Sequence, residues 1–168
     1  MRALAEAQIR DTATLCGLAP DKVMRRAETP SRLDPARRME LEFLPESYTR
    51  APKRVGKWTT GVHRRIRSQV YRVRLPVRAV VYGDDEGWLA GFVREFIGAL
   101  PNRMADSDGN LVRIRVEQAV RGGYVRKPVE VFVERNVGLH LVFEWMLCRD
   151  ADLPLIRAVD VKSGITIT

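Results

Sequence analysis

The segment from Asp106 to Asn110 carries residue types that bind calcium, with side-chain oxygens at alternate positions. In a calcium loop of this kind, glycine occupies the sixth position, where the chain turns sharply. Here Gly109 is the fourth residue, so the spacing does not fit. A glycine next to aspartate and asparagine is typical of a tight connection. The segment therefore predicts a turn rather than a metal site.

Other residues able to do chemistry are scattered along the chain. Asp84 and Asp85 precede an apolar periodic segment, which is typical of carboxylates that cap a helix. His63 lies among arginines in a segment that would not hold it in place as a general base. His140 alternates with apolar residues and has no nucleophile close to it in the sequence. We therefore expect no catalytic residues, no metal and no cofactor. An enzyme whose site is assembled from distant positions remains the alternative.

The two cysteines and the apolar runs bear on where the protein works. Cys16 and Cys148 lie within apolar periodic segments, which favours reduced packing residues over a disulfide framework. The N-terminus lacks the apolar region of a secretory signal. No run approaches the roughly 18 apolar residues of a membrane helix. We therefore expect a chain that is made in a cytoplasm and contacts no membrane.

Positive charge is concentrated in one section of the chain. Residues 22–78 carry 16 Lys and Arg against 5 Asp and Glu, whereas the remaining residues carry 13 against 16. A near-neutral body with one strongly basic section indicates an acidic partner, either nucleic acid or an acidic protein surface. A solvated basic surface without a partner is the simpler alternative.

The first half of the chain predicts a helix, two strands and a long connection between them. Apolar residues at helical spacing predict a helix over residues 2–16, ended by Gly17, and prolines predict an irregular connection over 18–36. Alternation predicts a half-buried strand over 38–44 and a second strand over 69–82, where Pro76 indicates a sheet edge or a bulge. Residues 46–67 have few apolar residues and predict an extended basic arm or hairpin.

The second half predicts one helix followed by strands. Trp88, Phe92, Phe96 and Leu100 lie on one face of a helix that we expect to pack on Val73, Leu75 and Val77. Strands are expected over 112–117, 129–134, 137–147 and 153–161, with a turn at 121–123 and a short break at Asn136. Helices segregated from runs of strands predict one α+β domain over residues 1–168, with an antiparallel sheet covered by helices on one face.

This order of elements resembles the tail terminator, or tail completion, family of tailed bacteriophages. The resemblance rests on the N-terminal helix, the basic excursion, the acid-capped helix over 88–100 and the terminal strand that includes residues 139–145. It implies a structural virion protein without enzymatic activity. Such a protein is assembled in the host cytoplasm into a ring, expected to be a hexamer, that caps the head-proximal end of the tail tube and contacts tail-tube and neck proteins. Another head–tail connector or minor tail protein is the nearest alternative.

The arm supplies the expected partner-binding residues. These seven basic residues are Arg50, Lys53, Arg54, Lys57, Arg64, Arg65 and Arg67. We expect them to bind acidic protein surface on a neighbouring copy or an adjoining tail ring. Possible partners in the later half of the chain are Glu130, Glu134, Glu144, Asp150 and Asp152. The alternative is a nucleic-acid-binding module, with Trp58 and Tyr48 as candidate stacking residues and non-specific contact to DNA.

Overall fold

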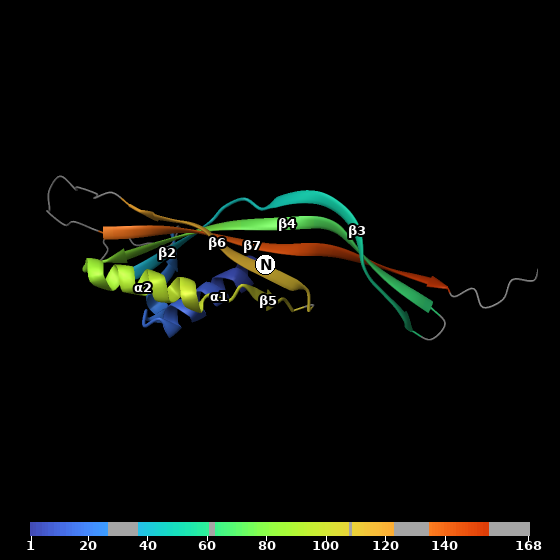
Figure 1. The fold of residues 1–168 in the computed structure, drawn as a ribbon, viewed down its shortest axis with the longest axis horizontal. Helices are drawn as coiled ribbons and strands as arrows, with labels where there is room; N and C mark the ends of the chain where they lie inside the picture. Colours follow the sequence, from blue (N-terminus) through green and yellow to red (C-terminus); the bar gives the residue numbers. More distant parts are fainter. Residues whose placement is uncertain (27–36, 61–62, 108, 123–134, 155–168) are drawn as a thin grey trace, which may run out of the picture.

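A single sheet runs the length of the molecule, and both helices lie against one of its faces at one end (Figure 1). The computed structural model describes residues 1–26, 37–60, 63–107, 109–122 and 135–154. In these ranges the elements are α1 (Arg2–Leu15), the 3-10 turn η1 (Pro20–Lys22), β1 (Val23–Arg25), β2 (Arg38–Phe43), β3 (Ser47–Thr60), β4 (His63–Gly83), α2 (Glu86–Ala99), β5 (Arg103–Ala105), β6 (Leu111–Arg121) and β7 (Arg135–Pro154). The predicted α+β class is confirmed.

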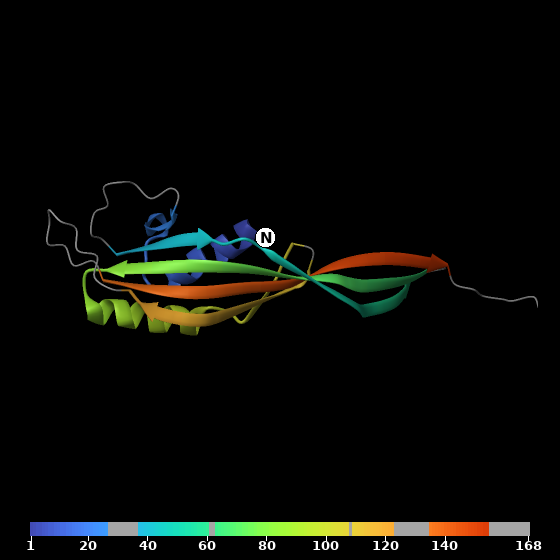
Figure 2. The ribbon, with the colours of Figure 1, turned by 90° about the horizontal axis from the view of Figure 1, so that it is seen from above.

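The sheet has the order β1-β2-β4-β7-β6-β5 across the described residues. β1 is parallel to β2, and the other neighbours are antiparallel. β3 also pairs with β4. It pairs with the N-terminal part of β4, whereas β2 pairs with the C-terminal part. β4 and β7 are therefore the two long central strands, which Figure 2 shows running side by side from the helices to the far end.

The two helices form where the sequence predicts them. In α1, Ala5, Ile9 and Ala13 recur every four residues and are fully buried, and Gly17 follows with a φ of +87°. In α2, the Asp85 carboxylate accepts a hydrogen bond of 2.5 Å from the Trp88 backbone N–H, so Asp85 caps the helix, as predicted, and the helix begins at Glu86. A left-handed glycine and an N-terminal carboxylate are the expected end signals.

The core lies between the helices and the body end of the sheet. Leu89, Phe92 and Phe96 of α2 are buried, and the Phe92 ring stacks on Trp88 with centroids 5.1 Å apart. They share one cluster of buried side chains with Leu75 and Val77 of β4, as predicted. Val73, predicted on the same face, is buried as well. β7 supplies Leu139, Leu141 and Phe143, so it is central to the core.

Two predictions about the first strands are wrong. Residues 18–36 are not irregular throughout, because Val23 is buried in β1 beside Met39 of β2. Two charged residues of β2 are also buried: Arg38 pairs with Glu40 at 3.1 Å, and its guanidinium lies 3.9 Å from the centroid of the Tyr82 ring. A cation over an aromatic face and a paired carboxylate offset part of the cost of burying this charge.

Two further predictions concern interruptions in the strands. Pro76 does not mark a sheet edge, because β4 is flanked on both sides; instead the Pro76 carbonyl accepts a hydrogen bond from the Leu44 N–H at the gap between β2 and β3. Asn136 does not break a strand, because β7 begins at Arg135. The strand predicted over 129–134 and the part of the last strand beyond residue 154 lie outside the described residues.

Candidate interaction surface on the arm

Beyond the helices the sheet narrows to three strands. We call this part the three-stranded arm and define it as residues 49–60 of β3, 63–72 of β4 and 146–154 of β7 (Figure 1). Gln69 is the single buried residue among the arm side chains that the structure describes. The body side of the boundary begins at Val73, which is 1% exposed. The predicted basic arm is therefore a hydrogen-bonded hairpin that β7 extends to three strands.

The arm has two open edges. β3 pairs with β4 on one side, and in the described ranges no strand lies along its other side. β6 pairs with β7 no further than Glu144, so the β7 residues of the arm pair with β4 alone over the same ranges. Both edges present backbone N–H and C=O groups that a further strand could use.

Nearly all of the net charge lies on the arm. Its residues include 9 Lys and Arg against 2 Asp, whereas the remainder of the chain carries 20 against 19. The nine are Arg50, Lys53, Arg54, Lys57, Arg64, Arg65, Arg67, Arg72 and Arg149. The body is thus close to neutral, and the electrostatic field that steers an acidic partner comes from the arm.

One face of the arm carries paired charges. Arg65 donates from Nε and Nη2 to the two carboxylate oxygens of Asp152, at 2.6 and 2.8 Å, and Arg67 does the same to Asp150, at 2.8 and 3.0 Å. These are cross-strand neighbours on β4 and β7. The hydrogen bond and charge of Arg67 lower the pKa of the Asp150 carboxyl, and Arg65 does the same to the pKa of Asp152. We call this the paired face.

Trp58 also lies on the paired face. It is opposite Arg65 in the register, and the Arg67 guanidinium lies 5.8 Å from the Trp58 ring centroid. Its side chain is 40% exposed. Tyr48, the other candidate for stacking, lies edge-on to Tyr71 and donates its hydroxyl to Glu46 at 2.6 Å. Tyr71 itself is half-buried. Tyr48 is the more exposed of the two candidate stacking residues, at 57%, but its hydroxyl and ring already have partners in its own chain.

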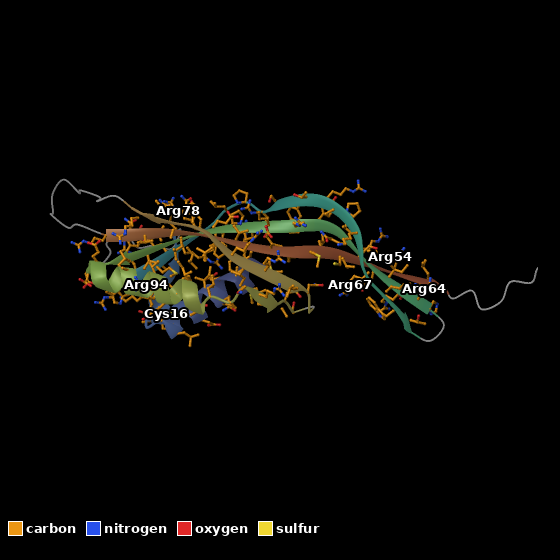
Figure 3. All side chains as sticks on the ribbon, in the orientation of Figure 1. Cys16, Arg54, Arg64, Arg67, Arg78 and Arg94 are labelled. Carbon is orange, nitrogen blue, oxygen red and sulfur yellow. The ribbon has the colours of Figure 1, made fainter. Side chains whose placement is uncertain are left out.

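The opposite face of the arm carries basic residues without carboxylate partners. In the register Arg54, Ser68 and Arg149 form one row, Lys57, Ile66 and Ala151 the next, and Thr59, Arg64 and Leu153 the third. We call this the open basic face and define it by Arg54, Lys57, Arg64 and Arg149. Within the part of the chain that the structure describes, these four form no salt bridge. Figure 3 shows Arg54 and Arg64 projecting from the arm, far from the helices.

The structure thus separates the seven predicted partner-binding residues into two groups. Arg65 and Arg67 are held by aspartates of their own chain, whereas we expected both arginines to contact another protein surface. Arg50, Lys53, Arg54, Lys57 and Arg64 have no salt bridge to a described carboxylate. Arg149 was missed, because the adjacent Asp150 cancels its charge in any local count along the sequence.

The residues first considered for metal binding have structural partners. The Asp106 carboxylate accepts hydrogen bonds from the backbone N–H and the side-chain amide of Asn110, at 2.7 and 3.0 Å, in the turn between β5 and β6. Glu117, twelfth when Asp106 is counted as first, pairs with Arg74 on β4. Across the described residues no group of His, Cys, Asp and Glu could hold a metal ion.

A groove of about 610 Å³ lies between α2 and the ends of β6 and β7. Its lining includes Leu89, Val93 and Ile97 of α2 and the ion pair between Glu86 and Arg121. The described lining holds no histidine, cysteine, serine or lysine. Elsewhere, burial raises the pKa of the Cys16 and Cys148 thiols, which disfavours the reactive thiolate form. The arm therefore remains the strongest candidate for a functional surface.

Comparison with known proteins adds no assignment. No protein-family model matches the sequence, and no curated protein matches it significantly. In the described parts of the chain, no helix combines the length and the apolar character needed to cross a membrane. The charge of the arm, its open edges and its lack of a core are therefore the features that bear on function.

Proposed function

We propose that the protein is a structural subunit that assembles with copies of itself into a ring at the head-proximal end of a phage tail tube. The observation that carries this proposal is an arm of three hydrogen-bonded strands in which one described side chain is buried. The order of elements, which resembles that of the tail terminator family, supplies the place in the virion and the expected number of six subunits.

The structure of the arm favours the proposed assembly, because a three-stranded sheet without a core is poorly stabilised on its own. Ordering a residue costs about 1–2 kcal/mol of backbone entropy, which a strand normally offsets by burying apolar surface. A small sheet without a packed face is marginally stable in water. Contacts with another chain would supply the missing burial. An arm held out from the body is well placed to make them.

The two open edges suggest how copies would meet. An exposed strand edge is a template for pairing with another chain. If an arm edge of one copy pairs with a different edge of the next, the contact is heterologous, and such contacts close into a ring when the rotation permits. The edge of β5 on the body is one available partner, because among the described strands it pairs with β6 alone.

Native mass spectrometry and negative-stain electron microscopy of the full chain test the proposal, with closed rings expected. The matched variant replaces residues 54–68 with Asn-Gly, which joins the paired residues Lys53 and Gln69 by a two-residue hairpin turn. It retains the body core, so we expect a folded monomer by circular dichroism and mass. A full chain that forms no rings, or a shortened chain that still forms them, contradicts the proposal.

Limited proteolysis provides an independent readout of the same contact. Trypsin should cut after Arg50, Lys53, Arg54 or Lys57 in the monomer, because these side chains are exposed and the arm lacks a core. In the assembled ring the same bonds should be protected. Equal protection in both states would show that the arm packs on its own domain.

A further inference from the structure

The open basic face is a compact patch of unneutralised charge. Its three rows extend from Ser68 to Arg64 of β4, a distance of four residue steps, which corresponds to about 13 Å at about 3.3 Å per residue. The three strands together are about 10 Å across at a spacing of about 4.8 Å. Arg54, Lys57, Arg64 and Arg149 therefore project from a small area in which no described residue is acidic.

A second copy of the chain offers little to neutralise this patch. Outside the arm the chain has almost equal numbers of basic and acidic residues. Most carboxylates of the described body are already engaged in ion pairs. These are Glu6, Glu40, Glu42, Glu46, Asp84, Glu86, Glu117 and Glu144. Contacts between copies are therefore better served by the strand edges than by the open basic face.

The composition of the face also disfavours a protein partner. The centres of protein interfaces are rich in aromatic residues and poor in charge. Between the basic residues of this face lie the short side chains of Ser68, Thr59 and Ala151, with Ile66 and Leu153 as its larger apolar residues. Interfaces with DNA are polar and strongly positive, as this face is.

We propose that the open basic face binds the backbone phosphates of duplex DNA without sequence preference. A duplex carries about one negative charge per 1.7 Å of its axis, so about eight phosphates lie along the length of the patch. Phosphate contacts carry no direct sequence information. A duplex is favoured over a single strand because none of the residues in the three rows of this face is aromatic, Trp58 being on the paired face.

The paired face orients this contact. There both carboxylate oxygens of Asp150 and of Asp152 accept hydrogen bonds from Arg67 and Arg65, respectively. The negative charges of the two aspartates repel phosphate. The paired face keeps only Lys53 and Arg72 without a described carboxylate partner, so the open basic face, with four such residues, is the more positive of the two. This inference is independent of ring formation, because it depends on side chains, whereas the proposed contacts between copies depend on backbone edges.

Fluorescence anisotropy of the full chain with a random-sequence 30-base-pair duplex tests the inference. Four phosphate contacts predict a slope of log affinity against log salt of about −3.6, at about 0.9 per contact. Affinity should then fall roughly 150-fold between 50 and 200 mM salt. In the variant with Arg54→Gln, Lys57→Gln and Arg64→Gln, the slope should fall to about −0.9.

The matched control neutralises the paired face, with Arg65→Gln, Arg67→Gln, Asp150→Asn and Asp152→Asn. It leaves the net charge of the chain unchanged, and its affinity and slope should match those of the parent chain. Thermal melting followed by circular dichroism checks that both variants are folded. Ring formation is measured on the same samples: an open-face variant that assembles but has lost DNA binding separates this inference from the proposed ring.

Three results would overturn the inference. The first is no binding of the duplex by the parent chain at 50 mM salt. The second is an equal loss of affinity in the open-face variant and the control, which would mean that the arm has no DNA-binding face. The third is binding of poly-glutamate, but not DNA, that depends on the open basic face, which would identify an acidic protein as its partner.

Discussion

The body and the arm share the long strands β4 and β7, yet they are stabilised in different ways. In the body, alternate residues of β4 from Leu75 to Val81 are buried in one cluster with residues of the helices. In the arm the same strand has one buried side chain, Gln69, among those described. The backbone ladder between β4 and β7 is continuous in both regions apart from one register shift.

This difference shows that two strands can stay paired through backbone hydrogen bonds beyond the point where the hydrophobic core ends. The body has a core of its own, so its stability should depend on packing. The arm depends on its backbone hydrogen bonds, on exposed ion pairs that contribute little individually, and on any partner it meets. Substitutions of similar size in the two regions should therefore have very different costs.

The largest expected effect is that of Phe92→Ala in the body. Phe92 is 3% exposed and stacks between Trp88 and Phe96, so the substitution should lower the free energy of unfolding by about 3–5 kcal/mol. The matched substitution Trp58→Ala in the arm should cost less than about 1 kcal/mol, because Trp58 is largely exposed. Urea unfolding followed by circular dichroism measures both. A cost under about 1 kcal/mol for Phe92→Ala would show that the helix is packed differently.

An intermediate effect is expected at two glycines that each lie beneath a tryptophan. A Cβ at Gly83 would lie 2.8 Å from the half-buried Trp88 ring, whereas one at Gly56 would lie 3.1 Å from the exposed Trp58 ring. Gly83→Ala should therefore cost about 1–3 kcal/mol as an overpacked site. Gly56→Ala should be within about 0.5 kcal/mol of neutral, because Trp58 can move into solvent.

Both glycine substitutions lower the entropy of the unfolded chain similarly, so the difference between them reports the tryptophan contact. Thermal and urea unfolding of the two variants measure it. Equal costs would mean that the arm side chains are held as firmly as those of the body, and would remove the distinction between the two regions.

The smallest expected effect is the pH dependence of the arm. Arg67 and Arg65 lower the pKa of Asp150 and Asp152 below the ordinary value of 3.8. The stabilisation is therefore complete above that value and is lost as pH falls through the lowered pKa. Hydrogen-exchange protection of the arm amides should fall about threefold between pH 5 and pH 2, since exposed pairs contribute little. An Asp150→Asn, Asp152→Asn variant should show no such fall, and an identical pH response in that variant would rule out these carboxyls.

The sequence was sufficient for features that depend on local pattern. The spacing of Phe92 and Phe96 predicted α2 and its buried face, and the lack of apolar residues around Lys53 and Arg64 predicted the arm. β1 was missed because three residues give too short a pattern. The burial of Arg38 could not be predicted, because it depends on Tyr82, which lies on another strand.

The division of the arm into two faces depends on contacts that no local pattern contains. Arg65 and Asp152 are separated by 87 residues in the sequence, and the register of β4 against β7 brings them together. Alternation along β4 would also have placed Arg65 and Arg67 on the same side as Val73. The register shift between Gln69 and Tyr71 changes that relation.

That register shift has a consequence for how the arm can vary. Tyr71 is opposite Leu147 and Gln69 is opposite Cys148, so one extra residue, Val70, reverses the sides to which odd and even positions of β4 point. While this shift is kept, loss or gain of one residue between Arg65 and Val70 would place Arg64 on the side of the aspartates and Arg65 on the opposite side. Across related sequences, we therefore expect the length of this stretch to be held more strictly than its residue types.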